Sequence, residues 1–160
     1  MVEYDHEHDD FYFRSIESGL SWDMETRRDT RIEDHTHVIW LGDLNYRIDL
    51  DKETVRSYIE LGNLEKLLEN DQLNRQKSVS AAFENFHEPR ITFNPTYKFD
   101  PGTENYDSSA KNRIPAYTDR ILFYSKETND IVPDTYRSHN EIKFSDHKVS
   151  PNSQFLRIVC

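Results

Sequence analysis

The sequence has only one cysteine among its 160 residues, Cys160 at the very end. A lone cysteine excludes a disulfide framework within the chain, and such usage is typical of a reducing compartment. There is also no run of about 18 apolar residues and no signal-peptide pattern. From these absences we expect a cytoplasmic protein.

Apolar residues are scarce as well. They make up 35% of the chain, whereas ordinary globular domains contain roughly 45–50%. The aromatic fraction of 12% is nevertheless too high for a disordered chain of this charge. The composition therefore predicts a folded chain of single-domain length with a thin hydrophobic core.

Positive charge is in the minority, with 20 Lys and Arg against 30 Asp and Glu, which gives a net charge of -10. A negative overall field argues against general affinity for nucleic acid or for anionic lipid. We therefore expect no nucleic-acid partner, although a local basic patch remains compatible with this total.

The clearest chemical signal is an apolar run, Val38 to Leu41, that leads into Gly42 and is followed by Asp43 and Asn45. Such a run is typical of a buried strand that ends at a glycine. If the chain stays extended, Asp43 and Asn45 point to the same side and place a base and a neutral donor at the strand end. The alternative is a simple turn, because Gly, Asp and Asn are ordinary turn residues.

The remaining hydrophobic pattern predicts a mixed α/β chain without internal repeats or linkers. Capping residues and apolar stripes predict helices at about 11–20 and 52–61, a helix capped by Asn63 with Leu64, Leu67 and Leu68 on one face, and a weaker helical stretch at about 71–82. Short apolar runs predict further strands at 91–93, 121–124, 131–136 and 155–159.

Polar residues stand beside three of the apolar runs: Asp43 with Asn45, Asp119, and Asp146 with His147. Hydrolysis at a phosphate needs a base that orients water, donors that hold the phosphoryl oxygens, and a metal ion that offsets charge. The sequence supplies candidates for these roles, while the spacing alone leaves open whether they meet in space.

Two long motifs resemble the signatures of the inositol polyphosphate 5-phosphatases: WLGDLNYR at 40–47 and PAYTDRIL at 115–122. Two short motifs, PTYK at 95–98 and SDHK at 145–148, match further family motifs in the right order. The match covers about residues 10–148 and is closest in texture to the branch that contains the Lowe-syndrome phosphatase. The resemblance implies an α/β fold, the two-sheet sandwich of DNase-I-like nucleases and phosphatases.

The family implies magnesium-dependent hydrolysis of the 5-phosphate of phosphatidylinositol 4,5-bisphosphate and related inositol phosphates, at a membrane surface or in solution. Asp43 would orient and activate the attacking water, and Asn45 would donate a hydrogen bond to the scissile phosphate. His147 would contact the same phosphate while Asp119 holds it. Asp146 would be a carboxylate on the metal side.

By the same resemblance, a basic patch would hold the neighbouring 4-phosphate of the inositol ring. Its candidates are Tyr97, Lys98, Lys111 and, more weakly, Arg113. The plainer alternatives are solvated loop lysines, a packing aromatic and a surface arginine. Arg47 and Arg120, although they lie inside the long motifs, are predicted to be structural.

The chain also departs from the family. The family domain is roughly twice this length, so residues 1–160 correspond to a partial catalytic domain, its second half. The glutamate that is the family's main magnesium ligand belongs to the first half, and Asp43, Asn45 and Asp146 alone make a poor octahedral site. A half-sandwich would also leave exposed a sheet face that the other half covers.

Two alternatives to an active enzyme therefore stay open. The chain could be a catalytically inactive half-domain fragment, as the absent glutamate suggests. It could also be a nuclease of the same superfamily, although a net charge of -10 argues against a protein that tracks a long phosphate backbone.

Overall fold

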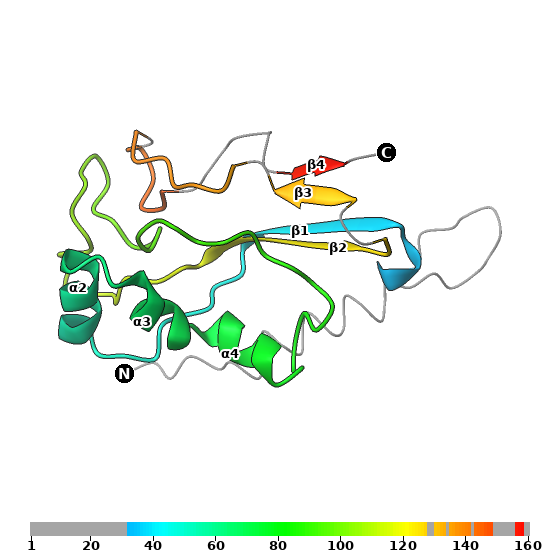
Figure 1. Cartoon of the computed structure of the whole chain (residues 1–160). Coiled ribbons are helices and arrows are strands. Elements are labelled where there is room, and N and C mark those ends of the chain that lie inside the picture. The colour runs from blue at the N-terminus through cyan, green and yellow to red at the C-terminus, as the bar shows by residue number, and fades with distance from the viewer. Residues whose placement is uncertain (1–31, 128–129, 134, 142, 149–155, 159–160) are drawn as a thin grey trace.

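The computed structural model describes residues 32–127, 130–133, 135–141, 143–148 and 156–158 (Figure 1). The predicted helix at 11–20 lies outside the described residues. Within them, the regular elements are the 3-10 helix η1 (Ile32–Asp34), the helices α2 (Lys52–Glu60), α3 (Leu64–Glu69) and α4 (Gln72–Ser78), and the strands β1 (His37–Asp43), β2 (Asp119–Ser125), β3 (Ile131–Pro133) and β4 (Leu156–Ile158). None of the described helices has the length and apolar character needed to cross a membrane.

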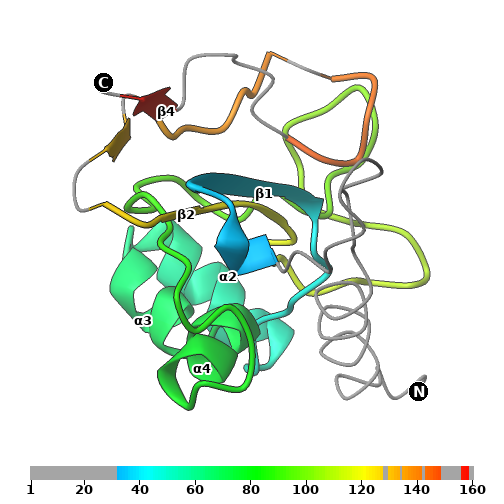
Figure 2. The same cartoon turned by 90° about the vertical axis from the view of Figure 1, so that its right-hand side faces the viewer.

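An antiparallel pair of strands, β1 and β2, forms the centre of the molecule. It runs from His37 opposite Ser125 to Asp43 opposite Asp119. β1 carries the first long motif and β2 follows from the second, so this pairing brings the two motifs to one end of the sheet. A second antiparallel pair, β3 and β4, lies on the side of β1 and β2 that faces away from the helices (Figure 2).

The two faces of the β1–β2 pair differ in burial. On one face Trp40 and Leu122 are cross-strand partners, and Trp40 packs edge-on against Phe83 with ring centroids 5.6 Å apart. On the other face Ile39 and Leu41 remain 47% and 66% exposed. An exposed apolar stretch on this sheet is the feature expected of a half-sandwich.

Each α-helix begins at a side-chain cap; the sequence predicts Asn63 and offers Asp49 or Asp51, of which Asp51 is the cap, whereas it does not single out Asp71. Asp51, Asn63 and Asp71 accept hydrogen bonds from the backbone N–H groups of Thr54, Lys66 and Asn74. α2 and α3 bury Val55 and Leu67 in a second core cluster with Ile48, Ile91 and Tyr117.

Two predicted elements are corrected. The predicted strand at 91–93 is wrong, because these residues form no strand; Ile91 is instead buried by its side chain alone. α4 ends at Ser78 rather than near residue 82. Ser80 and Phe83 both adopt positive φ, 53° and 52°, which takes the chain off the helix axis and turns Phe83 into the core.

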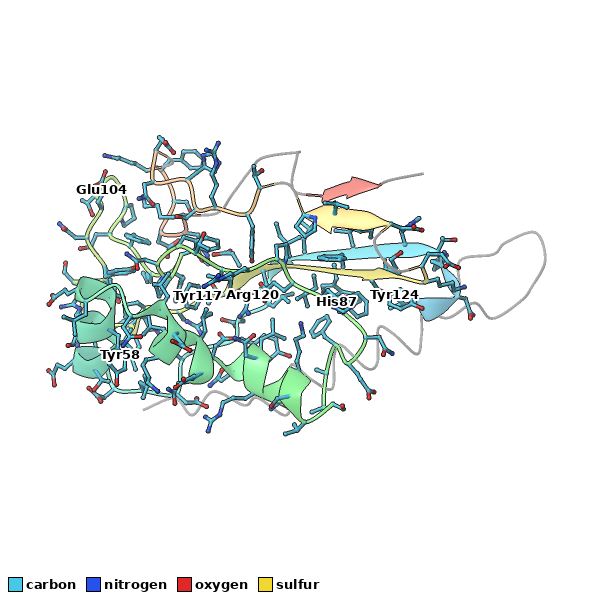
Figure 3. All side chains as sticks on the ribbon, in the orientation of Figure 1. Tyr58, His87, Glu104, Tyr117, Arg120 and Tyr124 are labelled. Atoms are coloured by element: carbon cyan, nitrogen blue, oxygen red, sulfur yellow. The ribbon has the colours of Figure 1, made fainter. Side chains whose placement is uncertain are left out.

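A buried arginine ties β2 to the helical layer (Figure 3). The Arg120 side chain is fully buried and lies 2.8 Å from Asp71, the cap of α4, and 2.7 Å from Glu88. Tyr136 donates a further hydrogen bond of 2.9 Å to Glu88. Burial lowers the pKa of Arg120, but Asp71 and Glu88 outweigh it and raise that pKa well above its ordinary value. The guanidinium therefore stays charged, in the structural role predicted for it.

Candidate active site

The three polar tips of the sequence meet at the end of the β1–β2 pair. His147 Nδ1 lies 3.0 Å from Asp119 Oδ2, and His147 Nε2 lies 4.0 Å from Asp43 Oδ2. Asp146 Oδ1 is also 4.0 Å from His147 Nε2. The imidazole therefore stands among three carboxylates that come from distant parts of the chain.

Backbone hydrogen bonds hold the short motifs against this end of the sheet. Phe99 N–H donates to the Asp146 carbonyl, and Lys148 N–H donates to the Thr96 carbonyl, both over 2.8 Å. Tyr97 exchanges two backbone hydrogen bonds with Ala116. The PTYK segment is thus flanked by the SDHK tip and by the start of the PAYTDRIL motif, and this arrangement fixes the position of His147.

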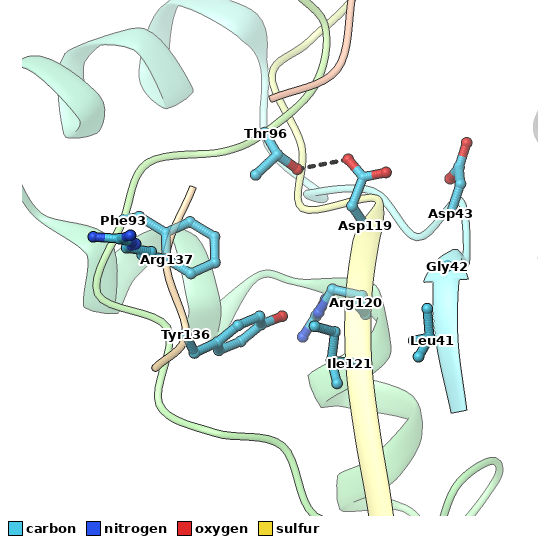
Figure 4. Close-up of a pocket in the computed structure, with 10 residues that line it drawn as sticks. All are labelled: Leu41, Gly42, Asp43, Phe93, Thr96, Asp119, Arg120, Ile121, Tyr136 and Arg137. Atoms are coloured by element: carbon cyan, nitrogen blue, oxygen red, sulfur yellow. Dashed lines mark hydrogen bonds between the residues drawn. The ribbon is translucent and has the colours of Figure 1, made fainter. Parts of the chain in front are cut away.

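Asp119 is held in one orientation by two hydroxyl groups (Figure 4). Thr96 Oγ1 donates to Asp119 Oδ2 over 2.8 Å, and Thr118 Oγ1 does so over 3.3 Å. The hydrogen bond that His147 Nδ1–H donates to Asp119 raises the pKa of His147, and burial only partly opposes this. The pair therefore favours a protonated imidazole, a suitable donor to an anionic phosphate. The sequence reasoning did not assign this role to Thr96, although the residue lies inside the PTYK motif.

Both interpretations of the segment after Gly42 are partly right. β1 continues through Asp43, and Gly42 has a φ of 146°, a conformation that favours glycine. The chain then turns, because Asn45 has a φ of 61° and its N–H donates to Asp43 Oδ1 over 2.9 Å. Burial, followed by the charge of Asp119, raises the pKa of Asp43. A raised pKa makes a carboxylate a better base for water.

Two of the four candidates for the 4-phosphate patch border this cluster. The Tyr97 ring lies 4.7 Å from the His147 ring, centroid to centroid, and Lys98 Nζ lies 3.6 Å from Asp146 Oδ2. Lys111 and Arg113 are exposed on the following loop. Within the described residues neither forms an ion pair, so their part in a 4-phosphate patch stays a prediction.

The loop that carries Lys111 and Arg113 is organised by a buried carboxylate, Asp107. Its N–H donates to the Lys98 carbonyl over 2.8 Å, while its side chain accepts the N–H of Ser109 over 3.0 Å and that of Arg113 over 2.7 Å. Burial raises the pKa of Asp107, but these hydrogen bonds outweigh it and lower the pKa to about 2. Asp107 is therefore ionised at all physiological pH values and links Lys98 to the loop.

We expect this loop to lose its order in strong acid. Because the folded pKa of Asp107, about 2, is below the ordinary carboxyl value, its contribution to stability is present above about pH 4 and fades as the pH falls toward 2. In NMR titrations the amide signals of Ser109 and Arg113 should hold steady down to about pH 4 and shift only below it. A transition near pH 4 would contradict the lowered pKa.

A cavity of about 250 Å³ lies beside Asp43 and Asp119 (Figure 4). Its lining is mainly apolar and includes Leu41, Phe93 and Ile121. None of the 4-phosphate candidates lines it. Tyr97 and Lys98 instead lie beside His147 and Asp146.

The described residues do not complete a metal site by themselves. Among them, no group of three or more His, Cys, Asp or Glu side chains is arranged to hold a metal ion. Asp146, the predicted metal-side carboxylate, instead lies within 3.6 Å of Lys98 Nζ. A magnesium ion prefers several oxygen ligands in octahedral geometry, so further ligands would have to come from elsewhere.

Comparisons with known proteins agree with the motifs. Residues 5–150 match the family described as Endonuclease/Exonuclease/phosphatase family 2. The chain is 49% identical over 118 residues to phosphatidylinositol 4,5-bisphosphate 5-phosphatase INP51 of Saccharomyces cerevisiae, covering 74% of this chain and 12% of that protein.

Two solved structures share the fold. The inositol polyphosphate 5-phosphatase domain of SPsynaptojanin, in complex with inositol (1,4)-bisphosphate and calcium, matches with a TM-score of 0.81 and 44% identity, over 90% of this chain and 40% of that one. A Cimex nitrophorin, solved as a ferrous nitric oxide complex, matches with a TM-score of 0.64 and 33% identity, over 78% of this chain and 41% of that one. The chain thus spans less than half of each solved domain, and a shared fold does not by itself imply phosphatase chemistry.

Proposed function

Because the chain belongs to endonuclease/exonuclease/phosphatase family 2, we propose that it supplies the second part of an inositol polyphosphate 5-phosphatase catalytic domain. The proposed reaction is hydrolysis of the 5-phosphate of phosphatidylinositol 4,5-bisphosphate and related soluble inositol phosphates. The observation that carries this proposal is the meeting of Asp43, Asp119 and His147 at one end of the β1–β2 pair. The names of the relatives support the choice of substrate.

Each residue has a role that its surroundings favour. Asp43, with its raised pKa, orients the attacking water and accepts its proton. Asn45 donates from its amide to the scissile phosphate. Protonated His147 donates to the same group, and Asp119 keeps the imidazole charged and oriented. Together these side chains provide the base and the donors that phosphoryl transfer requires.

Magnesium is proposed as the cofactor. It would offset the charge that develops on the phosphate oxygens. Asp146 is the described carboxylate that the family resemblance places on the metal side; it lies beside His147, and its side chain is 37% exposed. The main ligand would come from the part of the family domain that this chain does not match. The calcium ion in the SPsynaptojanin structure supports a divalent cation.

We further propose that the protein acts in the cytoplasm at the periphery of membranes. A phosphoinositide headgroup is reached from the water side, so a catalytic domain for it needs no spanning segment. The negative total charge, -10, supports a local contact with the headgroup rather than adhesion to anionic lipid as a whole.

The proposal is tested by joining the chain to the first half of a family domain, by fusion or co-expression, and measuring magnesium-dependent phosphate release from inositol polyphosphates. The matched control is the same assembly with Asp43→Asn, which keeps the shape and removes the base. Release that does not exceed this control would overturn the proposal.

An inactive half-domain is the second candidate, and the 40% coverage of the solved domain favours it for the isolated chain. The purified chain alone is then expected to release no phosphate. Turnover by the chain alone that stops on chelation would contradict this. A nuclease, the third candidate, would cleave plasmid DNA in preference to inositol phosphates.

Lys98→Met should weaken binding of substrates that carry a 4-phosphate. A hydrogen bond to a charged group contributes about 1.5–3 kcal/mol, so we expect KM to rise roughly 10- to 100-fold with little change in kcat. A substrate that lacks the 4-phosphate should show no such rise. Lys126→Met is the control, because Lys126 is an exposed residue at the other end of β2. An equal rise for both substrates would contradict a role in reading the 4-phosphate.

A further inference from the structure

The side chain of Arg47 folds back onto the active site instead of extending into solvent. Its Nε donates to the Asn45 carbonyl over 3.0 Å, and its Nη2 donates to Asn45 Oδ1. The backbone is fixed from the other side, because Arg47 N–H donates to Gln72 Oε1 over 2.6 Å and Gln72 N–H donates to the Arg47 carbonyl over 2.9 Å. Gln72 is 7% exposed, so Arg47 is anchored to a buried part of α4.

The contact with Asn45 determines which way the amide faces. A carboxamide has one acceptor atom and one donor group, whereas a guanidinium has donors only. Arg47 can therefore bind only Oδ1 of Asn45, and this leaves the Nδ2 donors turned away from it. Among the described residues no acceptor is paired with Asn45 Nδ2. The amide is thus held with its donors available to an anion.

The same guanidinium also supports the second phosphate donor. Arg47 Cζ lies 4.7 Å from the centroid of the Tyr97 ring, and Tyr97 in turn lies 4.7 Å from the His147 ring. A cation over a tyrosine face is attracted to it. Arg47, Tyr97 and His147 therefore form a contact chain, and the Tyr97 ring limits movement of the imidazole.

We propose that Arg47 is a positioning residue that orients both phosphate donors, the Asn45 amide and the His147 imidazole. The proposal rests on the proposed function, and it goes beyond the structural role predicted from the sequence. Arg47 acts through Asn45 and Tyr97, so its removal should misplace the donors without abolishing the base, Asp43. Lysine cannot replace it, because an ammonium group is a point charge and lacks the planar two-point geometry.

The first test measures kcat and KM in the assembly of the chain with a family first half. Arg47→Met should lower kcat roughly 10- to 100-fold, since a small misplacement of a donor can cost about 100-fold, and KM should change little. Arg47→Lys should be almost as poor. In an Asn45→Ala background, Arg47→Met should add at most a few-fold loss, because its main target is already gone. Losses that multiply, or full activity of Arg47→Lys, would overturn the proposal.

The second test does not depend on activity. In NMR spectra of the full 160-residue chain, Arg47→Met and Arg47→Lys should each shift the side-chain amide signals of Asn45 and the ring signals of His147. Arg56→Met is the matched control, because Arg56 is an exposed arginine on α2. Unchanged Asn45 signals in both Arg47 variants would overturn the inference. If the assembly shows no phosphate release while these signals shift, the proposed function fails and the positioning role stands.

Discussion

Asp119→Asn should lower the rate of phosphate release by roughly 100- to 1000-fold, the range expected when one preorganised hydrogen-bond donor to the reacting group is lost. Asparagine keeps the size of the side chain and can still accept from Thr96, but it removes the negative charge that faces His147 Nδ1 at 3.0 Å. The imidazole then loses the acceptor that orients it and the negative charge that contributes most to stabilising its protonated form.

The same variant should change the pH profile. In the wild type the pKa of His147 is raised above its ordinary value of 6.5, first by the hydrogen bond that its Nδ1–H donates to Asp119. The protonated donor is fully present below about pH 6.5 and is lost as the pH rises through the folded pKa. Asp119→Asn lowers that pKa, so activity should fall at a lower pH than in the wild type. The stability that the Asp119–His147 pair contributes should likewise be present below about pH 6.5 and be lost as the pH rises through the folded pKa. Thermal melts at several pH values measure this loss.

Asp130→Asn provides the matched control for this experiment. Asp130 pairs with another histidine, His37, over 3.3 Å at the opposite end of β1, so the substitution makes the same chemical change away from the site. Its turnover and pH profile should match those of the wild type. If Asp119→Asn also kept the wild-type pH profile, the Asp119–His147 pair would have no part in the reaction.

Arg120→Met should destabilise the fold by about 3–5 kcal/mol, the cost of removing one partner of a buried ion pair. Asp71 and Glu88 would be left in a buried site without the described cation that lies within 4 Å of both. Since 1 kcal/mol corresponds to about 2–4 °C in a chain of this size, the melting temperature should fall by roughly 10 °C.

Arg75→Met is the control for this loss, because the Arg75–Asp49 pair is more than a third exposed on both sides. Exposed pairs contribute about 0–1 kcal/mol, so this variant should melt close to the wild type. Equal melting temperatures for Arg120→Met and Arg75→Met would show that the buried network does not hold β2 to the helices. Urea titrations of both variants give the comparison in free energy.

The local features of the fold could be predicted from the sequence. Asp51, Asn63 and Asp71 each cap the helix that follows, because a cap depends only on residues three positions away. The pairing of β1 with β2 depends on contacts between distant segments, and no local pattern specifies it. At residues 91–93 the local pattern predicts a strand that the structure does not form. Ile91 is buried, but it has no strand partner in the described residues.

The candidate site was predictable where residue type and motif agree. Asp43, Asp119, His147 and Asp146 were all named from the sequence, and the structure brings them together. The contacts of Thr96 and Arg47 could not be predicted in this way, because a threonine or an arginine within a motif can serve several structural or functional roles. Only their contacts with Asp119 and Asn45 distinguish these uses.

Asp43 and Asp119 face each other across the β1–β2 pair. The register of the two strands therefore sets how the two candidate carboxylates lie relative to each other. A one-residue slip would turn one of them to the opposite side of the sheet. Deleting a single residue within either strand should therefore silence the site even in a chain that still folds. The loop over residues 101–105, whose tip is largely exposed, carries neither of these carboxylates.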